Sequence, residues 1–248
     1  MTKVYKMPRY LSLTLIGVVL LSGCSTLKST DDPSAQISSD PLEGLNRGIY
    51  AFNDTADKLI LKPVAKGYQA IVPEPAQRGV SNFFSNLGEP FSAANNLLQG
   101  KFDRTLSSIY RFTVNSTVGL FGLLDVAGHH EVEPAPEDFG QTLGAWGVGP
   151  GPYIMLPFMG PTNVRDGIGR VTSGFVYYPP SDLSDQSSTD VGLSVLQVVD
   201  TRASLLSVDS VLEQQVDPYS FIKSAYEQNR LNSLYDGSPP VAEEDFDF

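Results

Sequence analysis

Few residues of this 248-residue chain could perform catalysis or bind a metal ion. Both of its histidines, His129 and His130, are adjacent, and Glu131 follows them. Imidazole and carboxylate groups serve as metal ligands and general bases. However, the sequence contains no second cluster at ligand spacing and no Gly-x-Ser-x-Gly nucleophile motif. We therefore predict that the chain is not an enzyme and needs no cofactor and no metal ion. The His-His-Glu run is interpreted as a polar turn after Gly128.

The single cysteine, Cys24, stands at the end of an N-terminal signal over residues 1–23. A basic start precedes a run of about a dozen apolar residues, which is typical of a secretory signal and too short to span a membrane. Leu21–Cys24 (LSGC) resembles the lipobox of bacterial lipoproteins, which implies cleavage before Cys24 and acylation of that residue. Ser25 then resembles the sorting signal for the outer membrane. The alternative is an ordinary secretory signal followed by a buried cysteine.

The net charge of −11 and the isoelectric point near 4.5 limit the classes of partner. A nucleic-acid-binding surface needs a basic footprint. Docking on anionic headgroups needs clustered lysine and arginine. The composition argues against both, so any membrane contact is expected to be apolar or covalent.

An unusual stretch runs from Asp138 to Pro161 and contains the only tryptophan, Trp146. Its density of glycine and proline argues against a regular helix or a long strand. The remaining residues are mostly apolar, which predicts burial rather than a solvent loop. Two interpretations stay open: a buried crossover segment, or an irregular wall lining a groove or channel, where glycine permits close backbone packing.

Helical periodicity dominates the rest of the chain, and no useful period-two runs appear. Asp40-Pro41-Leu42-Glu43 predicts a helix start with a capping box. Further helices are predicted after Pro63, over Val80–Leu87, from a restart at Glu89-Pro90 to a cap at Gly100, and over 102–114, 164–175, 191–215 with a break near Asp209, and 217–235. We predict a mostly α fold without an extended sheet. A tether over 24–39 precedes one helical domain over 40–237, and an acidic disordered tail covers 238–248.

The segment Thr117–Gly128 (TVGLFGLLDVAG) is apolar on every side. It is either a buried helical hairpin or a hairpin that enters lipid. The second interpretation requires its backbone groups to be satisfied internally or covered by protein. The sequence does not distinguish the two.

Several motifs, in order, carry a resemblance to a known family. They are Asp40–Asn53 (DPLEGLNRGIYAFN), Leu61–Ala65 (LKPVA), Gly79–Leu87 (GVSNFFSNL), Leu97–Gly100 (LLQG), Glu137–Gly144 (EDFGQTLG), Gly147–Tyr153 (GVGPGPY), Leu156-Pro157, Gly160-Pro161 and Arg165-Asp166. This set resembles the MlaA (VacJ) family of outer-membrane lipoproteins over about residues 40–235. The tail beyond Gly237 carries no such resemblance.

The resemblance implies a ring of amphipathic helices in the inner leaflet of the outer membrane, facing the periplasm, around an amphipathic channel. It implies association with trimeric porins. It also implies a function: phospholipids misplaced in the outer leaflet are removed and passed to a soluble periplasmic lipid-binding protein, which maintains lipid asymmetry.

The resemblance further implies roles for particular residues. The first long helix would place four of them near the loop that controls opening: Asn46, Ile49, Phe52 and Asn53. The lipid-facing wall would be formed by Leu143, Trp146, Tyr153, Leu156 and Phe158. Arg165 and Asp166 would provide a polar spot for a headgroup, or they form a salt bridge at a helix end.

Two other functions remain as alternatives. One is an envelope tether that scaffolds partners without transport, and its docking face for a porin would be Asp200–Tyr235. The other is a phospholipase on the same membrane, for which the sequence supplies little chemistry.

Overall fold

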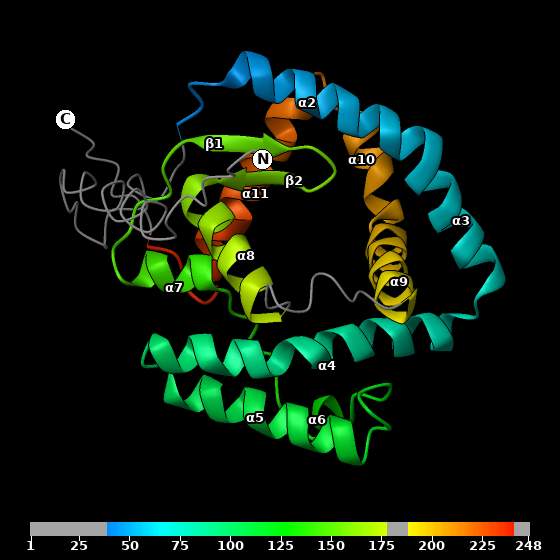
Figure 1. The fold of residues 1–248 in the computed structure, drawn as a ribbon, viewed down its shortest axis with the longest axis vertical. Helices are drawn as coiled ribbons and strands as arrows, with labels where there is room; N and C mark the ends of the chain where they lie inside the picture. The colour runs from blue at the N-terminus through cyan, green and yellow to red at the C-terminus, as the bar shows by residue number, and fades with distance from the viewer. Residues whose placement is uncertain (1–38, 178–187, 241–248) are drawn as a thin grey trace, which may run out of the picture.

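The computed structural model describes residues 39–177 and 188–240, and these residues are mostly helical. Figure 1 shows their helices arranged as a ring, with a small β-hairpin in its wall. The signal, Cys24, nearly all of the tether and the end of the acidic tail lie outside the described residues. The predicted mostly α, ring-like fold without an extended sheet is confirmed: the described residues contain one sheet, and it has two strands.

The elements follow one another with short connections. One continuous helical run begins the ring: α2 (Glu43–Ala56), the π-helix η2 (Asp57–Leu61) and α3 (Lys62–Ile71). The remaining elements are α4 (Glu74–Leu98), α5 (Phe102–Thr117), α6 (Val126–His129), α7 (Phe139–Ala145), β1 (Tyr153–Leu156), β2 (Gly160–Asn163), α8 (Val164–Tyr177), α9 (Ser188–Ser204), the 3-10 helix η3 (Leu206–Val208), α10 (Asp209–Glu213) and α11 (Pro218–Leu234).

The ring closes because elements far apart in the sequence pack on one another. The run α2–α3 forms one arc and α4 crosses the ring opposite α2, with α5 beneath it (Figure 1). Helix α9 packs against α3 and α4, and α11 packs against α7 and β2. Elements of the N-terminal and C-terminal halves therefore pack against one another in the ring.

Several predicted helix ends are confirmed. Gly100 follows α4 with a positive φ of 76°, which glycine adopts without a side-chain clash. The Asp217 side chain accepts a hydrogen bond from the Ser220 backbone N–H and caps α11. The predicted break near Asp209 is also present, because η3 separates α9 from α10.

Two local predictions are wrong. Helix α2 has no side-chain cap, because Asp40 instead accepts hydrogen bonds from Asn46 and Tyr219. The helix predicted after Pro63 is present as α3, with Pro63 in its first turn, and it continues from the π-helix η2 without a break. Glu89-Pro90 does not restart a helix: α4 runs through Pro90, and the Glu89 carboxylate pairs with Arg111 of α5.

The glycine-rich stretch is more regular than predicted. It holds the short helix α7 and an antiparallel hairpin in which Tyr153 pairs with Asn163 and Leu156 with Gly160. Most of the glycine and proline residues fall between these elements, but Gly140 and Gly144 lie within α7, and Gly160 and Pro161 lie in β2. At the hairpin turn, Phe158 and Gly160 have positive φ angles of 60° and 76°. The excluded helix therefore exists as the seven-residue α7, whereas the strands have four residues each and no long strand forms in this stretch.

The described residues bury more polar than apolar side chains. Eighteen polar or charged residues are buried, against nine apolar ones, and five of those nine are alanine. The larger buried apolar residues include Tyr153, Met155 and Tyr219, which form the main core cluster. Large apolar side chains are exposed along the long helices instead, which is the reverse of the pattern in a water-soluble protein.

Helices α4 and α5 show this reversal most clearly. The faces that they turn toward one another carry Asn86, Glu89, Ser92, Thr105, Ser108, Arg111 and Asn115. At the centre, the Arg111 guanidinium donates to Glu89 at 2.8 Å and to Asp125 at 3.0 Å. Leu106 and Ile109 of α5 point outward and are at least half exposed. Polar contacts between helices and apolar side chains outside are typical of helices packed within lipid.

The buried-hairpin interpretation of Thr117–Gly128 is wrong. Between the end of α5 and the start of α6 the segment forms turns in which Leu120 and Phe121 have positive φ, and Phe121 is 78 % exposed. Its backbone is hydrogen-bonded internally: Phe121 N–H donates to Ser116, Gly122 N–H to Asn115 and Leu124 N–H to Gly119. This backbone satisfaction meets the condition for entering lipid.

The buried pair Arg111–Glu89 yields a stability prediction. Arg111→Met leaves the Glu89 carboxylate buried without its cation and should lower the free energy of unfolding in detergent by about 3–5 kcal/mol. Adding Glu89→Gln should recover part of this loss. Arg78→Met, which removes an exposed pair with Glu74, is the matched control and should change stability little. An equal effect of Arg78→Met and Arg111→Met in denaturant titrations would contradict this account.

Candidate functional site

Asn46 joins the first helix to the hairpin. Its side chain is fully buried. The amide Nδ2 donates to the Tyr153 carbonyl at 3.1 Å and to Asp40 at 2.8 Å. Its Oδ1 accepts from the Met155 N–H at 2.9 Å. The Asn46 side chain thus satisfies two of the backbone groups along the free edge of β1, and the Tyr153 N–H donates to the Ser39 carbonyl.

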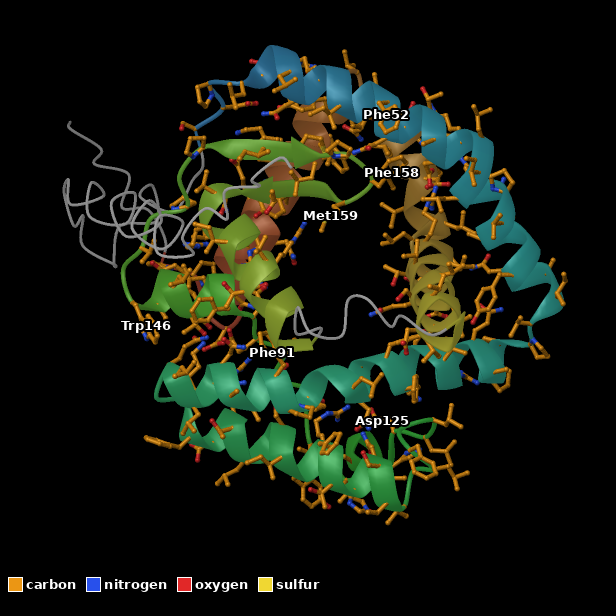
Figure 2. The ribbon with its side chains drawn as sticks, in the orientation of Figure 1. Phe52, Phe91, Asp125, Trp146, Phe158 and Met159 are labelled. Carbon is orange, nitrogen blue, oxygen red and sulfur yellow. The ribbon has the colours of Figure 1, made fainter. Side chains whose placement is uncertain are left out.

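Asn53 repeats this contact two helical turns later. Its Nδ2 donates to the Leu156 carbonyl at 2.9 Å, and its Oδ1 accepts from the Phe158 N–H at 2.8 Å. The rings of Phe52 and Phe158 meet edge to face, with centroids 5.1 Å apart. Figure 2 shows Phe52 on α2 beside Phe158 and Met159 at the hairpin turn. The structure therefore brings together predicted residues from the first helix and from the glycine-rich stretch.

Two cavities flank the hairpin turn. One has a volume of about 400 Å³ and is lined by Ile49, Phe52, Pro157 and Phe158, among others. The other, of about 440 Å³, is lined by Asn53, Met155, Gly160 and Pro161 together with residues of α10 and α11. The turn between them presents Phe158, which is 73 % exposed, and Met159. We define Pro157–Gly160 as the hairpin turn.

Not all residues of the predicted wall lie on one surface. Trp146 ends α7, where its indole N–H donates to the Leu98 carbonyl and its ring contacts Phe139. Figure 2 places it well away from the hairpin turn. Leu143 lies on the same short helix and is partly buried. Tyr153 is fully buried within the core. Of the five, Leu156 and Phe158 lie against α2.

Arg165 and Asp166 lie in a buried network at the start of α8. Both are less than 5 % exposed, and Arg165 Nε donates to Asp166 Oδ1 at 3.0 Å. This is the helix-end salt bridge of the sequence analysis, and its burial separates it from a headgroup in solvent or lipid. Arg230 of α11 completes the network by donating to Asp166 at 2.8 Å and to Asp138 at 2.6 Å.

Arg230 also sets the titration of the two aspartates. Burial by itself raises the pKa of Asp138 and Asp166, but the hydrogen bonds and charge of Arg230 outweigh burial, so both pKa values lie below the ordinary value. The carboxylates therefore remain charged and tie α7, α8 and α11 together. The sequence analysis missed Arg230, because nothing near it in the chain indicates partners 64 and 92 positions away.

A second arginine hub was also missed. Arg202 of α9 donates to Asp57 of η2 at 2.6 Å and to Asp209 of α10 at 2.9 Å. Lys62 reaches the same Asp209 at 3.0 Å. These contacts hold the π-helix η2 against α9 and the start of α10.

The His-His-Glu run lies on the surface. His129 and His130 are exposed, and His130 Nδ1 lies 2.7 Å from the Tyr110 hydroxyl. Within residues 39–177 and 188–240, no group of three histidine, cysteine, aspartate or glutamate residues is placed to hold a metal ion. In the same part of the chain, Asp190–Glu213 is long and apolar enough to cross a membrane by length and composition alone.

Comparisons with known proteins agree on one family. A family model described as MlaA lipoprotein matches residues 38–233. The Intermembrane phospholipid transport system lipoprotein MlaA of Escherichia coli (strain K12) is 41 % identical over 222 residues, which cover 88 % of this chain and 86 % of that one. Its Haemophilus influenzae counterpart is 34 % identical over 226 residues, covering 90 % and 89 %.

A structural comparison gives the same result. A solved structure described as "Structural basis for maintenance of bacterial outer membrane lipid asymmetry" superposes with a TM-score of 0.68 at 40 % identity. The match covers 79 % of this chain and 99 % of that one.

The Asn46 contact yields a prediction. Asn46→Ala leaves the buried Tyr153 carbonyl and Met155 N–H without their side-chain partner, and should lower the free energy of unfolding by about 2–4 kcal/mol. Asn53→Ala should cost less, because the Phe158 N–H is exposed and water can replace the amide. Denaturant titration in detergent tests both, with the exposed Asn229→Ala as control. Equal stability of Asn46→Ala and Asn229→Ala would refute the assigned role.

The Arg230 network predicts how stability depends on pH. A carboxylate whose pKa is lowered by folding stabilises the fold above its ordinary pKa, and this contribution is lost as the pH falls through the folded value. Unfolding free energy should therefore decrease as the pH falls below about 5. Asp138→Asn should make this decrease shallower, whereas Asp103→Asn on exposed α5 surface should not. Identical slopes for wild type and Asp138→Asn would contradict the assignment.

Proposed function

Because this chain belongs to the MlaA lipoprotein family, we propose that it acts in intermembrane phospholipid transport and maintains the lipid asymmetry of the outer membrane. The relatives from E. coli and H. influenzae are named for such a transport system. The solved relative is described in terms of outer-membrane lipid asymmetry. Membership covers nearly all of the described residues, so the proposal concerns the whole ring and not a fragment of it.

We further propose that the ring lies in the inner leaflet of the outer membrane and takes mislocalised phospholipids from the outer leaflet. Acylated Cys24 anchors the chain. The ring conducts the lipid without a chemical step and passes it to a soluble periplasmic lipid-binding protein. A trimeric outer-membrane porin holds the ring in place, with Asp200–Tyr235 as its docking face.

One observation carries this proposal: the described part of the chain packs polar side chains inside and leaves apolar ones outside. Leu106 of α5 is 64 % exposed and Leu59 of η2 is 72 % exposed, while Asn, Ser, Thr and Arg fill the contact between α4 and α5. Such a surface is unfavourable in water and favourable in hydrocarbon. A scaffold in the aqueous periplasm would have no use for it.

The hairpin turn is the proposed control point of the path. Phe158 and Met159 provide exposed apolar contact area at the turn, and Asn53 fixes the turn to α2 through two hydrogen bonds. Ile49, Phe52 and Leu156 line the adjoining surface. We therefore assign the lipid contact to the α2–hairpin region, and not to Trp146, Leu143 or Tyr153.

Surface phospholipid in cells lacking this chain tests the proposal. Outer-leaflet labelling and detergent sensitivity should both rise, and wild type should reverse them whereas Cys24→Ala should not. Phe158→Ser with Met159→Ser should lose most of the rescue because the apolar contact at the turn is removed. Normal asymmetry in the null strain would set transport aside in favour of an envelope tether.

Two further variants sharpen this test. His129→Ala with His130→Ala should rescue fully, and a complete loss would favour a phospholipase. Trp146→Ala, which removes a comparably exposed aromatic ring away from the turn, should also rescue. Loss of rescue by Trp146→Ala would extend the lipid path to α7 and overturn the assignment to the hairpin region alone.

A further inference from the structure

The cavity of about 440 Å³ is a distinct compartment of the ring wall. It lies where α2, the hairpin and the C-terminal helices α10 and α11 meet. Its interior is apolar and is formed by Met155, Pro161, Leu205, Leu212, Phe221 and Ile222, among others. Ligand sites commonly have about 300–1,000 Å³. The volume is near the lower end of this range, which suits a single hydrocarbon chain better than two.

A small charged cavity adjoins the apolar one. It has about 90 Å³, and the two share Tyr50, Asp54, Asp57, Arg202, Asp209 and Leu212 as lining residues. Lys58, Lys62 and Glu213 complete its charged lining. The apolar cavity thus lies beside a group of four carboxylates and three cations. A phospholipid likewise joins apolar acyl chains to a charged headgroup.

The floor of the charged cavity is fixed. Arg202 is held by both carboxylate oxygens of Asp57, at 2.6 and 2.8 Å, and by Asp209 at 2.9 Å. Bidentate pairs of this kind are geometrically specific, and the Arg202 and Asp57 side chains are only 14 % and 25 % exposed. We therefore do not expect Arg202 to leave these partners for a ligand.

The rim of the charged cavity can exchange partners. Lys58 pairs with Asp54 at 2.8 Å one helical turn away, and the Lys58 side chain is 57 % exposed. Lys62, whose side chain is 20 % exposed, pairs with both Asp209 and Glu213 at 3.0 Å, and the Glu213 side chain is 63 % exposed. Exposed pairs contribute little to stability, so an incoming ion can replace Asp54 at Lys58 or Glu213 at Lys62 at small cost, while Lys62 keeps its contact with Asp209.

We propose that the two joined cavities bind one phospholipid molecule, with an acyl chain in the apolar cavity and a zwitterionic, ammonium-bearing headgroup at the charged one. The inference rests on the proposed function and names a binding site within it. The site lies in the ring wall beside the hairpin turn.

The charges that line the smaller cavity determine which phospholipid headgroup it should prefer. A phosphate that binds Lys58 and Lys62 releases Asp54 and Glu213 from their cations. A primary ammonium on the same headgroup then pairs with a released carboxylate, so the site keeps its balance. An anionic glycerol headgroup offers no cation and would leave the carboxylates unpaired. The site should therefore prefer phosphatidylethanolamine over phosphatidylglycerol.

Native mass spectrometry of the full-length protein, released from non-ionic micelles doped with phosphatidylethanolamine, tests occupancy. Wild type should retain one phospholipid that Ala225→Trp does not, because the indole fills the apolar cavity from α11. Ala225 is exposed toward the cavity, so the larger side chain enters open space. Ser224→Trp, at the neighbouring exposed position outside the cavity lining, is the matched control and should retain the lipid. Equal retention by Ala225→Trp and wild type would overturn the site.

The headgroup assignment is tested separately with lipids of identical acyl chains. Phosphatidylethanolamine should be retained over phosphatidylglycerol by about fivefold, roughly the fold-change that one exposed ion pair is worth. Glu213→Gln, which removes a carboxylate that the ammonium would pair with, should reduce this preference, whereas Glu74→Gln in the exposed pair with Arg78 should not. Equal retention of the two phospholipids and of diacylglycerol would refute the headgroup site. The Glu213 side chain is 63 % exposed, so this arm does not depend on whether Ala225→Trp folds.

The outcomes separate this inference from the proposed function. Absence of a retained phospholipid in wild type would refute the cavity as a binding site, while the asymmetry measurement in cells would still test transport. Normal asymmetry in cells lacking the protein would refute transport, and lipid retention in micelles would then decide the binding site by itself.

Discussion

Polar side chains hold this ring together where most proteins use an apolar core. Three arginines act as hubs: Arg111 joins α5 to α4, Arg202 joins α9 to η2 and α10, and Arg230 joins α11 to α7 and α8. Each hub binds carboxylates from elements distant in sequence. Since buried charges require paired partners and good geometry, these contacts fix how the helices meet. Because few large apolar side chains are buried, the ring depends on these ion pairs.

The same constraint explains how the hairpin sits in the wall. A two-stranded sheet leaves unpaired backbone groups along its free edge. Asn46 and Asn53, seven residues apart on α2, bind these groups along β1. The apolar side chains are then left for the outside of the ring and for the cavities beside the hairpin turn. Fold and proposed lipid path therefore follow from one arrangement of polar partners.

The sequence was sufficient to predict most of the helices but not the contacts between them. Helical periodicity identified α5, α8 and α11, and the family motifs brought Asn46, Asn53 and Phe158 into one hypothesis. The burial of Tyr153 and the separation of Trp146 from the hairpin depend on which elements meet in space. Partners such as Arg230 and Asp138 have no local pattern linking them. Pro90 misled the prediction, because α4 stays continuous through it while Glu89 pairs with Arg111 of α5.

The central claim is that the body of the ring lies within lipid. It is tested by nitroxide labels at Leu106 and Leu59 on the outside, and at Ser224 on α11 as a comparison, in vesicles. The account predicts that Leu106 and Leu59 are more accessible to oxygen than to a water-soluble nickel complex, because oxygen concentrates in hydrocarbon. Equal access of the nickel complex to all three positions would show the ring in water and would contradict the account.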